Sequence, residues 1–269
     1  RLAQRFVNNG VRKLRLTGGE PLLRKNLSVL VAELNNISGV EDIALTTNAS
    51  LLTLDKAKEL KSAGLRRITV SLDAINQETF MQMNDMKVSV QKVLDGIDNA
   101  RSAGFDSVKV NMVVQKGVNE DDILPMAKYF KGTGNILRYI EFMDVGNTNG
   151  WNMQQVVSGQ EIVDRIQKVF PMKPADPNYK GEVAKRWRYE DGSGEVGVIT
   201  SVTEAFCGDC NRLRLSAEGS IYTCLFASHG VDLRRLLREG ASDEFINEVI
   251  SNTWKDRNDR YSEMRGKGD

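Results

Sequence analysis

The sequence predicts an α/β fold, built as a parallel sheet or a βα barrel. Short β-branched runs alternate about five times with segments of helical periodicity, the pattern of repeated βα units. Two predicted helices end in near-identical Ser-Ala-Gly sequences at Gly64 and Gly104, typical of glycines that terminate helices. The 269 residues, 41% hydrophobic and 27% charged, suit one large domain or a domain with a smaller lobe.

The elements of the first half follow one another in a regular order. The chain opens with helical spacing at Leu2, Phe6 and Val7. The predicted strands cover residues 11–16, 43–46, 67–72, 107–114 and 137–142, and the predicted helices cover residues 27–34, 55–63, about 89–102 and near 121–131. This spacing does not distinguish a closed barrel from an open sheet.

The second half has a different character. Ser158 is a plausible N-cap, with Glu161 three residues later, and three prolines after the helix predict a loop over residues 171–177. The further predicted elements are a helix near 158–169, a hairpin of 183–189 and 195–202, a hairpin at Gly219, and helices near 231–238 and 242–256. We therefore place a domain boundary near residue 145, with a barrel-like domain over 1–145 and a smaller α+β lobe over 146–269.

The cysteines carry the strongest chemical signal. Cys207, Cys210 and Cys224 are the only three in the chain, and three thiolates are one ligand short of a closed tetrahedral site. Such a metal centre keeps one position free for a ligand. Arg212 and Arg214 follow at alternate positions of a predicted strand, so both side chains leave on the same face. Two guanidinium groups beside a metal centre favour an anionic ligand.

Two alternatives apply to the same segment. His229 follows Cys224 closely, so a closed Cys3His zinc site fits the spacing about as well as an open centre. A disulfide is disfavoured because the cysteine count is odd and no secretory segment precedes it, which suits a reducing, cytoplasmic location.

The overall charge excludes some classes of partner. Lys and Arg total 37 against 36 acidic residues, a net charge of +1, so no global field recruits nucleic acid or an anionic membrane. The sequence also has no apolar run long enough to span a bilayer. Any anion site must therefore be local.

Polar residues gather where the predicted strands end, and the carboxyl ends of parallel strands carry function in α/β folds. The first strand ends in Gly18-Gly19-Glu20, which allows close backbone approach to a ligand or simply a tight turn. Thr46-Thr-Asn48 and Ser71-Leu-Asp73 follow the next strands, where N-caps are the commoner role. Basic groups that face a barrel interior need a partner or an anion; the fourth strand carries Lys109 and Asn111, and the fifth carries Arg138, Glu141 and Met143.

Taken together, these motifs resemble a known family. Leu-Thr-Gly-Gly-Glu-Pro, Thr-Thr-Asn, Ser-Leu-Asp, Val-Lys-Val-Asn, Arg-Tyr-Ile-Glu-Phe-Met and Phe-Cys-Gly-Asp-Cys-Asn-Arg-Leu-Arg occur in that order. The series is similar to the molybdenum cofactor biosynthesis protein A family, the radical S-adenosylmethionine (SAM) GTP 3′,8-cyclases, over residues 1–262. The Gly-Gly-Glu-Pro turn is shared by other radical enzymes, whereas the cysteine–arginine segment is specific to this family.

The resemblance implies a role for each motif. It implies an open, partial TIM-type βα barrel of six strands, capped by the cysteine-bearing lobe. Cys207, Cys210 and Cys224 would hold a [4Fe-4S] cluster whose open iron meets the guanine base. The implied GTP contacts are Arg15, Thr46, Lys109, Arg212, Leu213 and Arg214, and the implied SAM contacts are Gly19, Ser71 and Met143, with Gly18 and Glu20 shaping the same turn. It assigns no single catalytic residue within this chain.

The implied reaction is a lyase step that begins molybdenum cofactor biosynthesis. Reductive cleavage of SAM gives a radical that removes the 3′ hydrogen of GTP, and C3′ then bonds to C8 to give 3′,8-cyclo-7,8-dihydro-GTP. The implied partners are GTP, SAM and an electron donor; direct binding of cyclic pyranopterin monophosphate synthase and homodimer formation stay open. The competing hypothesis is a non-catalytic nucleotide-binding module with a structural zinc site.

One family motif is missing. The family carries Cys-x3-Cys-x2-Cys after its first barrel strand, where it holds a second [4Fe-4S] cluster with SAM, but no cysteine here precedes Cys207. We expect the first strand and this loop to lie upstream of Arg1, and the family's Gly-Gly tail beyond Asp269. A fragment of this kind should keep part of the GTP surface but make no radical.

Overall fold

Six parallel strands and an antiparallel pair form one curved sheet. The computed structural model describes residues 1–84, 88–145, 150–179 and 181–265, and in them eight strands follow the order β1-β2-β3-β4-β5-β8-β7-β6. Strands β1 to β5 and β8 run parallel, and β7 and β6 are added antiparallel. The bounds are β1 Lys13–Leu16, β2 Asp42–Thr47, β3 Arg67–Ser71, β4 Val108–Val114, β5 Ile136–Glu141, β6 Met172–Ala175, β7 Lys185–Tyr189 and β8 Glu195–Ile199.

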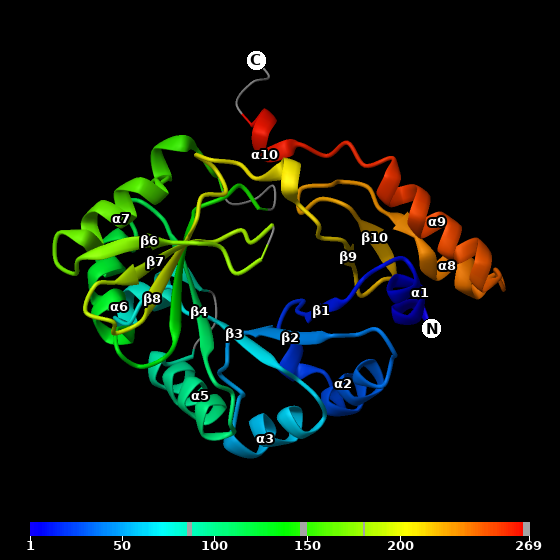
Figure 1. Cartoon of the computed structure of the whole chain (residues 1–269), viewed down its shortest axis with the longest axis horizontal. Helices are drawn as coiled ribbons and strands as arrows, with labels where there is room; N and C mark the ends of the chain where they lie inside the picture. Colours follow the sequence, from blue (N-terminus) through cyan, green and yellow to red (C-terminus); the bar gives the residue numbers. More distant parts are fainter. Residues whose placement is uncertain (85–87, 146–149, 180, 266–269) are drawn as a thin grey trace.

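Helices cover the outer face of the sheet and leave its inner face open (Figure 1). They are α2 Leu27–Asn35, α3 Leu54–Ser62, α5 Val90–Ser102, α6 Ile123–Phe130 and α7 Gly159–Gln167. Local sequence sets their starts: Thr53 and Ser158 each accept a hydrogen bond from an amide of the first turn, at 3.2 Å. Gly64 and Gly104, with φ of 106° and 90°, end α3 and α5 as predicted. The predicted open barrel is thus confirmed.

Alternation along the strands separates the core from the inner face. In β4, Val108, Val110 and Met112 are fully buried under the helices. Lys109 and Asn111 lie between them and therefore face the inside of the curved sheet, which we call the lumen. Glu141 of β5 falls on the buried side with Leu137 and Tyr139, not with Arg138.

The C-terminal lobe has its own small core. Strands β9 Arg214–Leu215, β10 Ser220–Tyr222 and β11 Val231–Asp232 form an antiparallel sheet beside α8 Leu233–Arg238 and α9 Asp243–Lys255. The buried residues of this core are Phe6, Ile221, Leu233, Ile246 and Ile250. Phe6 comes from α1 Leu2–Asn8, so the first helix of the chain packs in the C-terminal lobe (Figure 1).

Most of the predicted elements are present, including both hairpins, β7–β8 and β9–β10. The loop predicted over residues 171–177 is wrong in part, because Met172–Ala175 forms β6. Among the residues that the structure describes, strand β6 pairs only with β7, and an edge strand tolerates Pro174 because its outer side needs no amide donor.

Several short elements were not predicted from the sequence. These are α4 Gln77–Met83, α10 Tyr261–Met264, and the 3₁₀ turns η1 Pro21–Leu23, η2 Glu120–Asp122, η3 Met153–Gln155 and η4 Cys207–Asp209. The domain boundary near 145 stays a prediction: residues 146–149 lie outside the described ranges, and the large sheet continues into β6, β7 and β8. Over the described ranges, no helix combines the length and apolar character that crossing a bilayer requires.

Candidate active site

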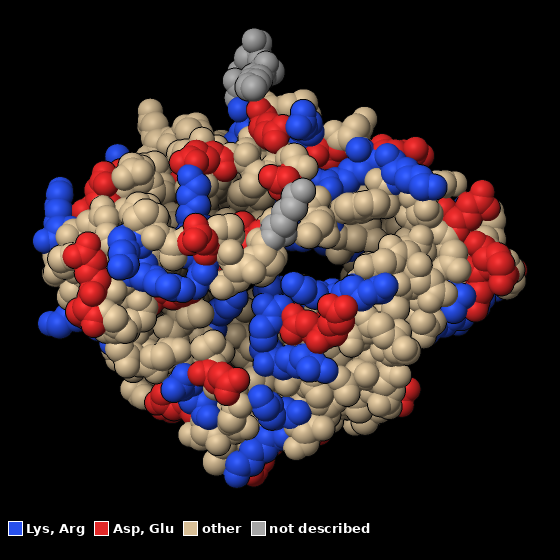
Figure 2. Space-filling view, in the orientation of Figure 1, with Lys and Arg blue, Asp and Glu red and all other residues tan. Residues whose placement is uncertain are grey.

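Four basic side chains from neighbouring strands share the lumen. Arg15, Arg67, Lys109 and Arg138 come from β1, β3, β4 and β5. Each is close enough to others of the set for their charges to interact. Figure 2 shows Lys and Arg side chains gathered around a hollow in the middle of the face viewed. Because like charges are crowded here, the lumen favours an anion of high charge.

Short polar side chains fix the direction of two of these cations. Arg15 Nη1 donates to Thr46 Oγ1 at 3.1 Å, which links the predicted GTP contacts of β1 and β2. Arg138 Nε donates to Asn111 Oδ1 at 2.9 Å. Neither contact neutralises a charge, because a hydroxyl and an amide oxygen accept the bonds, so both guanidinium groups keep their positive charge for a ligand.

Crowding and burial change the acidity of these groups. Burial, with the nearby Arg138 and Arg67 charges, lowers the pKa of Lys109 to about 8. Burial, with the Arg15 charge, lowers the pKa of Arg138 to about 10. The Arg15 side chain is accessible to solvent but has protein on several sides. This partial burial and, to a smaller extent, the Arg67 charge lower the pKa of Arg15. Perturbed groups gathered in one hollow indicate a functional site.

The predicted SAM-binding residues lie at one edge of the sheet. Gly18 and Gly19 follow β1, Ser71 ends β3, and Met143 follows β5, so all four stand at the carboxyl ends of parallel strands. Gly18 has φ of 140°, a conformation that favours glycine. Ser71 is exposed, and Met143 is half-buried.

Glu20 shapes the turn after β1. Its carboxylate accepts hydrogen bonds from Thr47 Oγ1 at 2.6 Å, from the Asn48 amide at 2.7 Å and from the Leu22 amide at 2.9 Å. The end of β1 is therefore tied to the end of β2. With three protein donors engaged, Glu20 acts in the structure as a brace for the turn.

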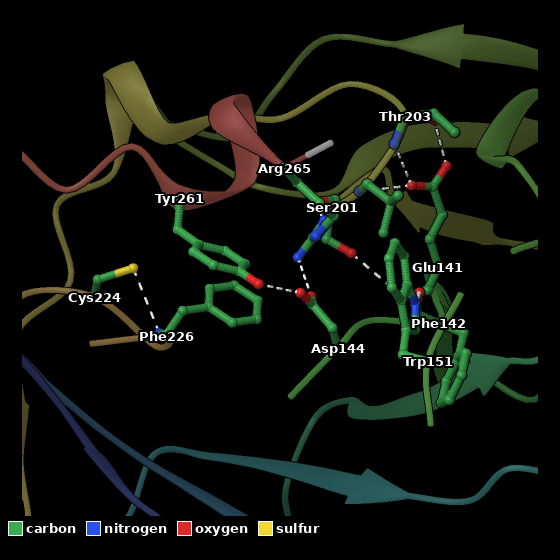
Figure 3. Close-up of polar contacts among 11 residues, drawn as sticks. Glu141, Phe142, Asp144, Trp151, Ser201, Thr203, Cys224, Phe226, Tyr261 and Arg265 are labelled. Carbon is green, nitrogen blue, oxygen red and sulfur yellow. Dashed lines mark hydrogen bonds and ion pairs between the residues drawn. The ribbon is translucent and has the colours of Figure 1, made fainter. Parts of the chain in front are cut away.

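Cys207 and Cys210 lie in the loop between β8 and β9, which we call the cysteine loop, and Cys224 follows β10. All three are free thiols and half-buried. Arg212 Nε lies 3.3 Å from Cys210 Sγ, and the Phe226 amide donates to Cys224 Sγ at 3.5 Å (Figure 3). Burial works against ionisation of the Cys210 thiol, but hydrogen bonds from Arg212 outweigh it and lower the pKa.

Arg214 lies among these sulfur atoms. Burial and the Arg212 charge lower its pKa, while Cys210 and Cys224 act in the opposite direction, so both thiols are within electrostatic reach. Its Nη1 is buried without a hydrogen-bond partner among the described residues. A buried guanidinium nitrogen without a partner is costly, and a ligand acceptor would satisfy it.

The cysteine loop and the lumen meet through the arginines. Arg212 contributes to the lowered pKa of Arg15, so the loop faces the cations of the barrel. Leu213, between the two arginines, packs against the core of the C-terminal lobe. The strand predicted to carry both arginines begins only at Arg214, so the prediction is wrong for Arg212.

The thiols do not form a ready-made site for a single ion. In the described part of the chain, no three His, Cys, Asp or Glu side chains converge closely enough to hold a metal ion. His229, the fourth ligand of the zinc alternative, is exposed.

The sequence prediction missed three residues of the lumen. Arg67 forms an ion pair with Asp42 on β2, and the distance from Nε to Oδ1 is 3.1 Å. Arg67 lies two residues before Thr69 on β3, so strand alternation could have shown that both side chains are on the same face of the sheet. Tyr179 and Glu182 come from the loop between β6 and β7. The Tyr179 ring centroid lies 4.2 Å from Lys13 Nζ, and Glu182 raises the pKa of Lys109 and Arg138. No sequence pattern indicates which way such a loop folds.

Glu141 joins three elements at the carboxyl end of β5. Its fully buried carboxylate accepts bonds from the Gly159 amide at 2.7 Å, from the Val202 and Thr203 amides at 2.8 Å each, and from Thr203 Oγ1 at 2.5 Å (Figure 3). Val202 and Thr203 begin the segment that leads to Cys207. Glu141 therefore fixes the base of the cysteine loop to the barrel.

A second polar cluster fastens residues 261–265 to the same end of β5. Arg265 forms an ion pair with Asp144, and Tyr261 Oη also donates to that carboxylate (Figure 3). The Arg265 guanidinium lies 5.1 Å from the Phe226 ring centroid and 5.3 Å from that of Trp151. This contact places the C-terminal segment beside the residue that follows Met143.

Comparisons with known proteins identify the family of this chain. Residues 1–130 match the Radical SAM superfamily, and residues 135–263 match the family described as Molybdenum Cofactor Synthesis C. The chain is 53% identical over 264 residues to a GTP 3′,8-cyclase of Xanthomonas campestris pv. campestris, covering 98% of this chain and 77% of the relative. It is 51% identical over 269 residues to a GTP 3′,8-cyclase of Acidothermus cellulolyticus, covering 98% of this chain and 74% of the relative.

A solved structure confirms the fold. The crystal structure of Streptococcus suis SuiB bound to S-adenosylmethionine is similar with a TM-score of 0.62 and 13% sequence identity, over 92% of this chain and 59% of that chain. At that identity the likeness concerns the fold alone. The identity to the curated relatives, over nearly the whole chain, shows more: the protein belongs to the GTP 3′,8-cyclase family of the radical SAM superfamily.

Proposed function

We propose that the protein is a GTP 3′,8-cyclase, a lyase that converts GTP to 3′,8-cyclo-7,8-dihydro-GTP in the first step of molybdenum cofactor biosynthesis. The observation that carries the proposal is 53% identity to a GTP 3′,8-cyclase over 98% of the chain. The lumen supports it independently, because its crowded cations suit a nucleoside triphosphate and the arginines beside the cysteines extend the same positive surface.

The GTP site we propose lies between the lumen and the cysteine loop. Arg15, held by Thr46, and Lys109 would bind the triphosphate from the barrel side, and Arg212 and Arg214 would bind from the lobe. Leu213 would contribute its backbone. Groups fixed on different strands and on the loop orient one nucleotide from two sides, which is the main requirement for bringing C3′ and C8 of the same molecule together.

The thiols fit a [4Fe-4S] cluster better than a zinc ion. A zinc site brings four ligands to about 2.3 Å from one ion, whereas the irons of a cluster each take a different cysteine. Cys207, Cys210 and Cys224 are reduced, half-buried and beside guanidinium groups that favour thiolates. We propose that they hold the cluster and leave one iron open to the guanine base.

The carboxyl ends of β1, β3 and β5 form the SAM site that we propose. Gly18 and Gly19 would let the backbone approach SAM, Glu20 would brace their turn, and Ser71 and Met143 would contact it from the neighbouring strand ends. With a second [4Fe-4S] cluster and an electron donor, bound SAM supplies the radical chemistry that begins at the 3′ hydrogen of GTP. The chain's own residues would hold GTP beside it in the lumen.

Nucleotide binding tests the proposal directly. The full chain, reconstituted anaerobically with iron and sulfide, should bind GTP more tightly than ATP, because a cluster held by the three cysteines would favour the guanine base. Arg214→Met should weaken GTP binding by roughly tenfold or more, since a charge-assisted contact to phosphate is lost. Arg238→Met, at an exposed arginine of the same lobe, is the control. Equal affinity for GTP and ATP would contradict the assignment.

Metal content separates the cluster from the zinc alternative. We expect about four irons per chain after anaerobic reconstitution, and no loss of iron in His229→Ala. One zinc per chain that is lost on the same substitution would show a structural Cys3His site instead.

A further inference from the structure

The turn that carries Cys207 and Cys210 is held by a residue from far along the chain. Arg257 donates from Nη1 to the Cys210 carbonyl and from Nη2 to the Cys207 carbonyl, the latter at 3.4 Å. The Cys210 amide also donates to the Cys207 carbonyl, at 3.2 Å, which closes the 3₁₀ turn η4. One planar guanidinium group therefore spans the backbone of both cysteines.

A second side chain from the same part of the chain accepts a hydrogen bond from a backbone amide of the turn. Glu263 Oε1 accepts from the Gly208 amide at 3.2 Å, and Glu263 Oε2 lies 3.0 Å from Arg260 Nε. Residues 257–265, which we call the clamp segment, thus provide both a donor and an acceptor to η4. The turn itself is short and has exposed residues, so its own contacts are few.

Both ends of the clamp segment are anchored. The Arg257 guanidinium lies 5.0 Å from the ring centroid of Trp254 at the end of α9. At the other end, Arg265 and Tyr261 bind Asp144, and Arg265 Nη1 donates to the Ser201 carbonyl at 3.2 Å. Figure 1 shows the segment running from α9 to α10 between the lobe and the barrel. A segment with two fixed ends can hold the short turn in one position.

We propose that Arg257 is a positioning residue, which presets the Cys207–Cys210 turn for the iron–sulfur cluster by bridging the two cysteine carbonyls. Glu263 assists by holding the Gly208 amide. Two parallel donors in a rigid fork fix the distance between the carbonyls, which a single-point contact does not do. The assignment of the cluster rests on the proposed function, but the clamping of the turn is a property of the chain without any cluster.

The test compares the turn with and without the fork. In the metal-free full chain, Arg257→Met should speed hydrogen exchange at the Cys210 amide several-fold, and after reconstitution it should release iron to a ferrous chelator several-fold faster. Arg257→Lys should lie between the two, because an ammonium group keeps the charge but lacks the planar fork. Arg238→Met should behave as the unchanged chain does in both measurements.

Two results would overturn the proposal. One is unchanged exchange and iron release in Arg257→Met; the other is full recovery in Arg257→Lys, which would reduce the role of Arg257 to its charge. Should Arg257→Met fail to fold, Glu263→Ala tests the same clamp through the Gly208 amide, and unchanged exchange there would also count against it. A wild-type chain that takes up no iron would refute the proposed function, while the exchange measurement would still decide the clamp.

Discussion

Lys109 is the titratable group of the lumen closest to physiological pH. Burial and the neighbouring guanidinium groups lower its pKa to about 8, so it loses its charge as the pH rises through that value. We therefore expect GTP binding to weaken by roughly tenfold between pH 7 and pH 9, the effect of losing one charged contact to phosphate. Equilibrium dialysis across this range at constant ionic strength measures it.

The matched control for Lys109 is Lys109→Arg. An arginine stays protonated across the range, so its binding curve contains only the titration of the nucleotide and of other residues. The same pH dependence in Lys109→Arg and in the unchanged chain would rule out Lys109 as the group responsible.

Asp73 makes the stability of the fold depend on pH. Burial raises its pKa to about 6, although the Val113 amide donates to it at 2.7 Å and acts in the opposite direction. Because the folded chain holds the proton more tightly than the unfolded chain, the contribution of Asp73 to stability is fully present below the ordinary pKa near 4 and is lost as the pH rises through 6. The two-unit shift corresponds to a loss on the order of 3 kcal/mol.

Asp73→Asn isolates this effect. The asparagine keeps an acceptor for the Val113 amide and cannot ionise, so the variant should lack the fall in stability between pH 4 and pH 6 that the unchanged chain shows. Urea unfolding across that range measures the difference. Identical pH profiles of the two chains would exclude Asp73 as its source.

At the scale of elements, the Glu141 carboxylate connects β5, α7 and the loop after β8 through its hydrogen bonds. Glu141→Gln replaces one carboxylate oxygen by an amide donor that faces backbone amides, so buried donors lose their acceptor. We expect a loss of about 2–4 kcal/mol in the free energy of unfolding.

The control for Glu141 is Glu161→Gln on α7. Glu161 pairs with Arg165 at the surface, and such a pair contributes about 0.5 kcal/mol. Urea unfolding of both variants gives the comparison, and a loss in Glu141→Gln as small as that of the control would show that the junction does not depend on the carboxylate.

The regular elements could be predicted because their signals are local. The N-cap at Ser158, the terminating Gly64 and Gly104, and the alternation of β4 each specify an element from a few residues. Strand β6 was missed because whether a proline is tolerated depends on which side of the strand has a partner, and a single sequence does not show this.

The residues of the candidate site also fall into a predictable group on strands and an unpredictable group on loops. Lys109 and Arg138 could be placed toward the barrel interior from their positions in predicted strands, whereas Arg15 was indicated only by the family resemblance. Tyr179, Glu182 and Arg257 could not, because they reach the site by loop paths and by a contact that joins residues 50 positions apart. Tertiary packing decides such contacts.

At the scale of the whole molecule, α1 connects the two cores. It leads directly into β1 of the large sheet, while Phe6 is buried in the core of the C-terminal lobe with Ile246 and Ile250. Phe6→Ala should cost about 3–5 kcal/mol of local stability, the range for a large buried side chain. The loss should appear as faster hydrogen exchange in α9 and β10.

The large sheet provides the reference for Phe6→Ala. Helix α5 packs on the other core, so its amides should keep their protection in this variant. Uniformly faster exchange in α5 and α9 would instead mean that the two cores unfold as one unit.

The position of the clamp segment also bears on how the protein is made. Cys207 leaves the ribosome 50 residues before Arg257, so the sulfur ligands exist for a time without the guanidinium fork that sets their spacing. On the role proposed for Arg257, a nascent chain at that stage lacks the contact that presets the turn. We therefore expect the turn to become fixed only after the polypeptide has passed beyond α9.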